Sequence, residues 1–164
     1  MSNGNLKIND SSGALTGIPV LFPLLPKQIS ENWAYIQAGI KASVLDGKVM
    51  TDRELTDILQ GLVLRRMQCW FGGLSTETED HQVSFEPYVM AITTLMNKNL
   101  VVIGLVEYAP VGRDLGMALV AQLRDFAKAW GCKIITSVTT QPAVIEAAKS
   151  VGSTADYTVL SLEV

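Results

Sequence analysis

The sequence has little of what metal centres and disulfide frameworks need. It contains one histidine, His81, and two cysteines, Cys69 and Cys132, which are far apart in the chain. Metal motifs need clustered His or Cys ligands, so we expect no metal site. We expect both cysteines to be buried free thiols in a reducing cytosol, as unpaired cysteines usually are.

An excess of positive charge and a long hydrophobic run are also missing. The chain has 13 Lys and Arg against 16 Asp and Glu, a net charge of −3. The basic residues are scattered, so neither nucleic acid nor an anionic membrane is an expected partner. The longest apolar runs are about half of a membrane span. No basic segment with an apolar core and cleavage site marks a secretory signal, so we expect a soluble protein in the cytoplasm.

The composition that remains is typical of one globular domain. The chain has 164 residues, of which 48% are hydrophobic and 18% charged, enough to bury about two thirds of its unfolded surface. We expect an extended N-terminal arm over residues 1–26 and a single domain over residues 27–164. Residues 18–26 are apolar but include three prolines, which exclude a helix and a central strand. This segment either crosses the domain's own surface or packs on a neighbouring subunit.

The most informative stretch is a strand, a turn and an amphipathic helix. Val, Ile and Leu crowd residues 100–109, which predicts a strand, and Gly104 within it suggests a bulge or a close approach of another chain segment. The following helix is predicted to begin with Asp114 as its cap and to end at Gly131. A short turn from a strand into a helix aims free backbone N–H groups at one point, which favours binding of an anion.

Hydrophobic periodicity and turn residues predict the other elements. A helix over residues 29–44 is expected, capped by Ser30, and a second helix follows the capping box formed by Thr51 and Glu54. The remaining expected elements are a strand at 67–71 stopped by Gly72–Gly73, a loop at 76–82, a strand at 87–96, a turn at 97–99, a strand at 133–140 parallel to 100–109, a short helix at 141–151 and a terminal strand at 155–164.

The turn before the long helix resembles a known family signature. It reads Pro110-Val-Gly-Arg113-Asp-Leu-Gly116-Met-Ala118, similar to the P-x-x-[QR]-x-x-G-x-[GA] pattern of the GNAT superfamily of acyl-CoA-dependent N-acetyltransferases. Over roughly residues 29 to 164 the order of elements also resembles small GNAT-like proteins encoded by bacteriophages. The resemblance implies an α/β fold in which helices flank a mixed, mostly antiparallel sheet with one splayed parallel strand pair.

The same resemblance implies a binding site for acetyl-CoA. Its pyrophosphate would be held by backbone N–H groups of the turn, and Arg113 would add positive charge. Backbone N–H groups near Glu107 and Tyr108 would polarise the thioester, and Glu107, the single carboxylate of that strand, is the candidate base. The expected cofactor-binding residues are Tyr108, Gly112, Arg113, Asp114, Leu115, Gly116, Met117 and Ala118. The alternatives are that this turn is only a helix start packed on the sheet, and that Glu107 is only solvent-exposed.

Two departures from the family pattern keep a second function open. The family commonly carries a tyrosine four residues before a Gly-Phe pair, to protonate the leaving thiolate. Here Ala148 stands at that position and Ser153 follows Gly152. In addition, Asp114 would place a carboxylate beside the phosphates. The alternative function is a non-catalytic virion or assembly protein of a phage, contacting neighbouring subunits through residues 1–26.

Overall fold

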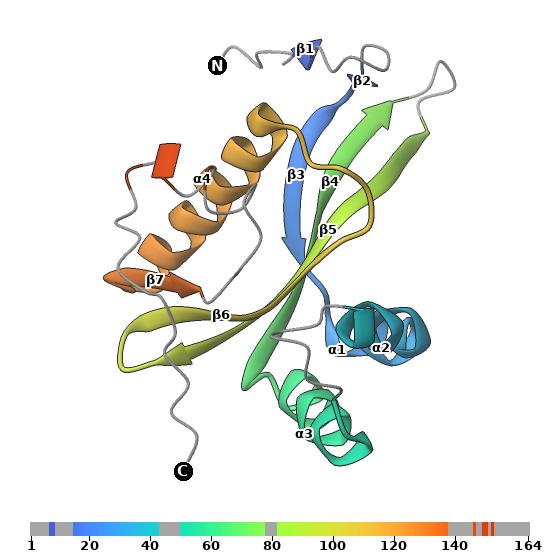
Figure 1. Ribbon diagram of the computed structural model, residues 1–164, viewed down its shortest axis with the longest axis vertical. Helices are drawn as coiled ribbons and strands as arrows, with labels where there is room; N and C mark the ends of the chain where they lie inside the picture. The colour runs from blue at the N-terminus through green and yellow to red at the C-terminus, as the bar shows by residue number, and fades with distance from the viewer. Residues whose placement is uncertain are drawn as a thin grey trace.

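The part of the chain that the structure describes is built around a five-stranded sheet with the strand order β3-β4-β5-β6-β7, shown in the computed structural model of Figure 1. The structure describes residues 7–8, 15–42, 50–77 and 82–137, with positions 146, 149, 150 and 152. The strands are β3 (Ile18–Pro23), β4 (Met67–Glu77), β5 (Val83–Met96), β6 (Asn99–Glu107) and β7 (Ile134–Ser137). Neighbouring strands are antiparallel except β6 and β7, which are parallel. The expected mixed, mainly antiparallel sheet with one parallel pair is confirmed.

Strand β6 extends beyond the described part of its parallel partner. It pairs with β7 from Asn99 to Val102 and then continues to Glu107. Within the described residues, the second half of β6 therefore has no neighbour on the β7 side. The turn before it is confirmed, since Asn97 and Lys98 have φ of 50° and 63°, as a tight hairpin turn between antiparallel strands requires.

The glycine pair Gly72–Gly73 does not stop β4, so this prediction was wrong. The strand runs through both glycines to Glu77, and its register with β5 shifts between them. A Cβ on Gly72 would lie 2.9 Å from a Leu119 methyl group, and one on Gly73 would overlap the Glu86 carbonyl oxygen. These glycines permit close approach of neighbouring segments, which a local turn rule cannot distinguish from chain reversal.

A second irregularity confirms the bulge expected at Gly104. Ile92 of β5 pairs with Gly104, whereas Thr93 pairs with Val102. Ile103 is therefore the extra residue on β6, a β-bulge that reorients the side chains around it.

Three helices cover one face of the sheet (Figure 1): α1 (Pro26–Glu31), α2 (Trp33–Ala42) and α3 (Asp52–Val63). The single helix expected over 29–44 is wrong in two respects, because it begins at Pro26 and is interrupted at Asn32. Ser30 is not the cap, since its hydroxyl donates to the Pro26 carbonyl. The capping box of Thr51 and Glu54 is confirmed.

The N-terminal segment contributes an edge strand, β3, to the domain's own sheet. Its outer edge is covered by Gln122, whose side chain accepts from the Leu21 N–H at 2.8 Å and donates to the Pro19 carbonyl at 2.9 Å. Proline at an edge removes donors that would otherwise invite pairing. A separate two-stranded pair joins β1 (Lys7–Ile8) to β2 (Leu15–Thr16). Contacts of residues 1–26 with neighbouring subunits stay a prediction.

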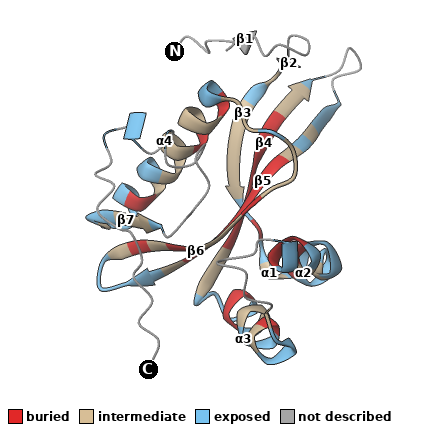
Figure 2. Ribbon diagram, viewed as in Figure 1, coloured by how far each residue is buried: buried red, intermediate tan, exposed pale blue. Residues whose placement is uncertain are grey.

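Helix α4 (Arg113–Ala129) packs on the other face of the sheet. Buried residues concentrate in the middle of β4 and β5 and on the inward sides of the helices (Figure 2). The two faces have separate cores, listed here by their buried members: Leu24, Ile29, Ile36, Ile40, Leu55, Leu62, Cys69, Phe71, Met90, Ile92 and Val106 under α1–α3, and Trp70, Leu74, Tyr88, Val89, Ala91, Val102, Leu115 and Leu119 under α4.

Several expectations lie outside the described residues. These are residues 78–81 of the predicted loop, the turn at 46–47, the end of the strand at 138–140 and the terminal strand at 155–164. The loop prediction was wrong at 76–77, which belong to β4. Of the predicted helix 141–151, positions 146, 149 and 150 have helical backbone, and Gly152 has φ of +87°. Among the described helices, none is both long and apolar enough to cross a bilayer.

Candidate functional site

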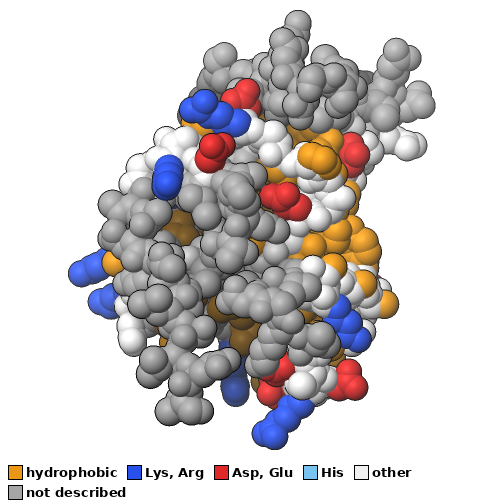
Figure 3. All heavy atoms as spheres, in the orientation of Figure 1, with side chains coloured by type: hydrophobic (Ala, Val, Ile, Leu, Met, Phe, Trp, Pro, Cys, Tyr) orange, Lys and Arg blue, Asp and Glu red, His pale blue; other side chains and the backbone are white. Residues whose placement is uncertain are grey.

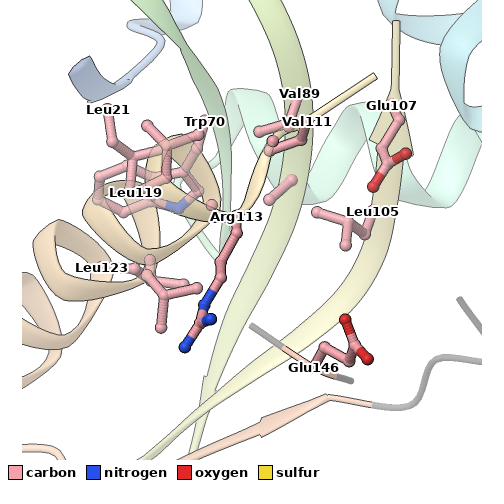
Figure 4. Close-up of a pocket in the computed structure, with 14 residues that line it drawn as sticks. Leu21, Trp70, Val89, Leu105, Glu107, Val111, Arg113, Leu119, Leu123 and Glu146 are labelled. Atoms are coloured by element: carbon pink, nitrogen blue, oxygen red, sulfur yellow. The ribbon is translucent and has the colours of Figure 1, made fainter. Parts of the chain in front are cut away.

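A cavity of about 240 Å³ lies between α4 and the sheet. Figure 4 shows Leu105 and Glu107 of β6 on one side of it, Trp70, Leu119 and Leu123 on the other, and Arg113 between them. The residues that line it are Leu21, Trp70, Val89, Ala91, Leu105, Glu107, Val111, Gly112, Arg113, Gly116, Leu119, Val120, Leu123 and Glu146. Its walls are therefore largely apolar, with charged groups at the start of α4, the end of β6 and residue 146.

The beginning of α4 leaves backbone donors unused at one end of this cavity. Gly112 is the N-cap and has no side chain that could accept a capping hydrogen bond, and Asp114 lies inside the first turn, so the expected capping by Asp114 is wrong. The first intrahelical bond runs from the Gly116 N–H to the Gly112 carbonyl at 3.0 Å. The helix thus makes no use of the N–H groups of residues 112–115. These donors and the positive end of the helix dipole favour an anion here.

The expected cradle of residues 112–118 divides into groups with different roles. Gly112, Arg113 and Gly116 line the cavity, whereas Leu115 is 2% exposed and belongs to the core under α4. Met117 and Ala118 do not line it, and their N–H groups lie inside the helix, where the i→i−4 ladder uses them. The N–H groups without a partner inside the helix are therefore those of residues 112–115 rather than 116–118, and of these four residues Gly112 and Arg113 line the cavity.

Glu107 and Tyr108 lie next to each other in sequence but on opposite faces of the sheet. Glu107, half-buried at the end of β6, lines the cavity. The Tyr108 ring packs under α2, stacked on Tyr35 with ring centroids 4.8 Å apart, and its hydroxyl donates to the Met90 sulfur at 3.3 Å. Side chains alternate along a strand, so only one of two consecutive residues can enter the cavity.

The backbone of Tyr108 is also engaged, contrary to its expected role. Its N–H donates to the Tyr88 carbonyl at 2.8 Å, so in this structure it is not free to polarise a thioester. Burial raises the pKa of the Tyr108 hydroxyl above its ordinary value, and the neighbouring Tyr35 and Cys69 raise this pKa further. The hydroxyl is protonated at neutral pH and directed away from the cavity, so it cannot protonate a group that is bound there.

Sequence reasoning missed the floor of the cavity and one carboxylate. The floor includes Trp70, whose indole N–H donates to the Thr93 hydroxyl at 2.8 Å and whose ring packs edge-on against Phe126. Its strand was expected, but which face of that strand meets α4 depends on the sheet. Glu146 also lines the cavity, although no pattern around it distinguishes it from other helix glutamates.

The residues present fit a ligand with an anionic end and an apolar body. The donors of residues 112–115 and the exposed Arg113 can hold a phosphate group, and the apolar walls can take an uncharged chain. Asp114 is exposed and does not line the cavity, which limits its repulsion. Over the face shown in Figure 3, charged side chains of both signs are scattered rather than gathered into one patch. Among the described residues, no group of His, Cys, Asp or Glu is arranged to hold a metal ion.

Solved acetyltransferases share this fold at low sequence identity. An aminoglycoside acetyltransferase from an uncultured soil metagenomic sample, in complex with sisomicin, matches with a TM-score of 0.60 and 10% identity over 89% of this chain and 95% of that one. A predicted acetyltransferase with acetyl-CoA from Clostridium acetobutylicum gives 0.55 and 14%, covering 88% and 96%. An acetyltransferase from Trypanosoma brucei gives 0.53 and 13%, covering 90% and 100%.

Identities this low show the fold alone, and the expected GNAT-like fold is confirmed. No family model matches the sequence, and no curated protein matches it.

Proposed function

We propose that this protein binds acyl-CoA between α4 and β6 and transfers the acyl group to an amine. The observation that carries the proposal is one cavity that is lined by Gly112, Arg113 and Gly116 at the start of α4, by apolar walls and by Glu107. Structural likeness to acetyltransferases, one of them solved with acetyl-CoA, supports the same ligand. We therefore favour a catalytic function over the purely structural alternative.

Each part of the cavity has a role in this proposal. The N–H groups of residues 112–115 and the Arg113 guanidinium bind the pyrophosphate. Gly116 lets the phosphates come close to the helix because it has no side chain. The apolar side chains of β5, β6 and α4 surround the pantetheine arm and exclude water. Acyl-CoA supplies a thioester, whose acyl carbon is open to attack by an amine.

Glu107 is the proposed general base. It is half-buried at the end of β6, beyond the last residue paired with β7, and its carboxylate can accept the proton that a substrate ammonium loses to become the attacking amine. The Tyr108 hydroxyl is on the other face, so water is the proposed donor of the proton that the leaving thiolate takes up.

Binding is tested by calorimetric titration of the protein with acetyl-CoA and with free CoA. We expect dissociation constants in the micromolar range for both ligands. Gly116→Glu should weaken both by more than about tenfold, because it places a carboxylate against the phosphates, and Arg113→Ala should weaken both by about tenfold through the loss of a charged contact. Lys128→Ala is the matched control, since it removes an exposed cation from the last turn of the same helix.

No heat at millimolar ligand, or equal affinities for Gly116→Glu and the wild type, would contradict the phosphate site. That result would favour the alternative in which the fold serves assembly with neighbouring subunits.

Catalysis is tested by release of the CoA thiol from acetyl-CoA in the presence of a panel of primary amines. Glu107→Gln keeps the shape of the side chain but cannot accept the proton. We expect kcat to fall by about 10²-fold or more with little change in acetyl-CoA affinity. An unchanged kcat for Glu107→Gln with a reactive amine would remove this residue from the mechanism.

A further inference from the structure

A second cavity lies on the opposite face of β6, under α2 and α3. Its volume is about 130 Å³. The residues that line it are Ile40, Met50, Ile58, Met90, Ile92, Ile103, Gly104 and Val106. None of these carries a charged or hydrogen-bonding side chain apart from the methionine sulfur. The cavity is separate from the proposed acyl-CoA site, since Gly104 and Val106 face it whereas Leu105 and Glu107 line the other cavity.

The cavity arises because the β-bulge in β6 is followed by Gly104, which has no side chain. The extra residue Ile103 turns two consecutive positions, 103 and 104, toward the same cavity, and Gly104 leaves its share of the space unfilled. A Cβ added to Gly104 would have Ile92 Cβ as its nearest neighbour, at an ordinary 3.8 Å. The backbone of Gly104 does not have the positive φ that would require glycine.

Packing elsewhere under the same helices is tight. A Cβ on Gly39 of α2 would lie 2.6 Å from the Tyr108 hydroxyl oxygen, and one on Gly61 of α3 would lie 2.9 Å from the Met67 sulfur. The cavity is thus a local feature of a close-packed core. Protein interiors contain few voids larger than a water molecule, and an empty void of this size is destabilising.

We infer that this cavity binds a small apolar group, of the size of a phenyl ring or a short branched alkyl chain. The volume supports this class, because an engineered apolar cavity of about 150 Å³ in another protein binds benzene. The lining supports it as well, since a polar ligand group would lose its hydrogen bonds to water without replacement by the lining side chains. The inference is independent of the acyl-CoA proposal, because the two cavities lie on opposite faces of the sheet.

The NMR signals of the methionine methyl groups report directly on ligand binding in this cavity. In protein labelled with ¹³C at the methionine methyl groups, benzene should shift the resonances of Met50 and Met90, which line the cavity. The resonances of Met96 and Met117, which do not line it, should stay in place. Unchanged Met50 and Met90 resonances at saturating benzene would overturn the inference, as would equal shifts at Met96 and Met117. Phenol should bind at least about tenfold more weakly than benzene, and equal affinity would contradict an apolar site.

Variants of the lining residues distinguish benzene binding in this cavity from a general effect of benzene on the solvent. Gly104→Val should fill the space, raise the melting temperature and weaken benzene binding by at least about tenfold. If Gly104→Val does not fold, Gly104→Ala makes the same test with one methyl group. Ile58→Val is the matched control because it enlarges the same cavity, and it should retain the benzene response. An undiminished response in a folded Gly104 variant would place the ligand elsewhere.

Discussion

Replacing Gln122 by methionine is expected to lower the free energy of unfolding by about 2 kcal/mol. The Gln122 side chain makes two hydrogen bonds to the outer edge of β3, at 2.8 Å to the Leu21 N–H and 2.9 Å to the Pro19 carbonyl. Each such bond contributes about 1 kcal/mol, and backbone groups that stay partly buried without a partner add to the loss. Methionine keeps the length and helix propensity of glutamine, so the change isolates the two bonds.

The assay is urea unfolding followed by circular dichroism, with a thermal scan in parallel. A loss of 2 kcal/mol in a chain of this length lowers the melting temperature by about 4–8 °C, and the denaturant slope should stay constant. Gln122→Glu should be intermediate, because it keeps the acceptor for Leu21 and loses the donor to Pro19. Gln60→Met, at an exposed position of α3, is the matched control. If Gln122→Met and Gln60→Met differ by less than about 0.5 kcal/mol, the bonds to β3 do not hold that edge.

Other predictions concern the packed glycines and the thiols. Gly73→Ala should cost about 3 kcal/mol or more in unfolding experiments, because its Cβ would overlap the Glu86 carbonyl oxygen; a loss below about 1 kcal/mol would mean that the strands can separate there. Burial raises the pKa of the Cys69 thiol from 9.0 to about 12. The full contribution of this thiol to the free energy of unfolding is therefore present below pH 9. It falls as the pH rises from 9 toward 12, because the thiol ionises in the unfolded chain but not yet in the folded one. The difference in unfolding free energy between the wild type and Cys69→Ala should therefore fall by about 1 kcal/mol per pH unit in that range, and a constant difference would contradict the burial. At pH 8, a thiol reagent should modify the half-buried Cys132 and leave the buried Cys69 intact, as mass spectrometry of peptides would show; modification of both at one rate would refute this.

The local sequence was sufficient for the elements whose signals are local. The capping box at Thr51, the turn at Asn97–Lys98 and the periodic apolar face of α4 each depend on residues within a few positions of one another. The strand–turn–helix unit from β6 to α4 was also predicted, since it needs only an apolar run, a short turn and an amphipathic pattern. Its detail was less accurate, because Gly112 rather than Asp114 is the N-cap.

Glycines and strand faces were beyond local rules. The sequence pattern at Gly72–Gly73 predicts a turn. In the structure these positions are glycine because Leu119 and Glu86, which are distant in the chain, approach them closely. The same holds for the candidate site. Sequence reasoning selected Glu107 and Tyr108 together, whereas the pleat of β6 places them on opposite faces and a bond to Tyr88 occupies the Tyr108 N–H.

The sequence by itself thus determined the types of the main elements, the irregularity at Gly104 and the short turn that leads into α4. The tertiary structure alone decided that β3 is an edge strand held by Gln122, that Trp70 and Glu146 line the first cavity, and that a second cavity exists. The physical reason is the separation along the sequence between the residues that interact. Helix and turn signals arise from hydrogen bonds between near neighbours, whereas edges, faces and cavities result from contacts between segments as far apart as Leu21 and Gln122, which no local pattern encodes.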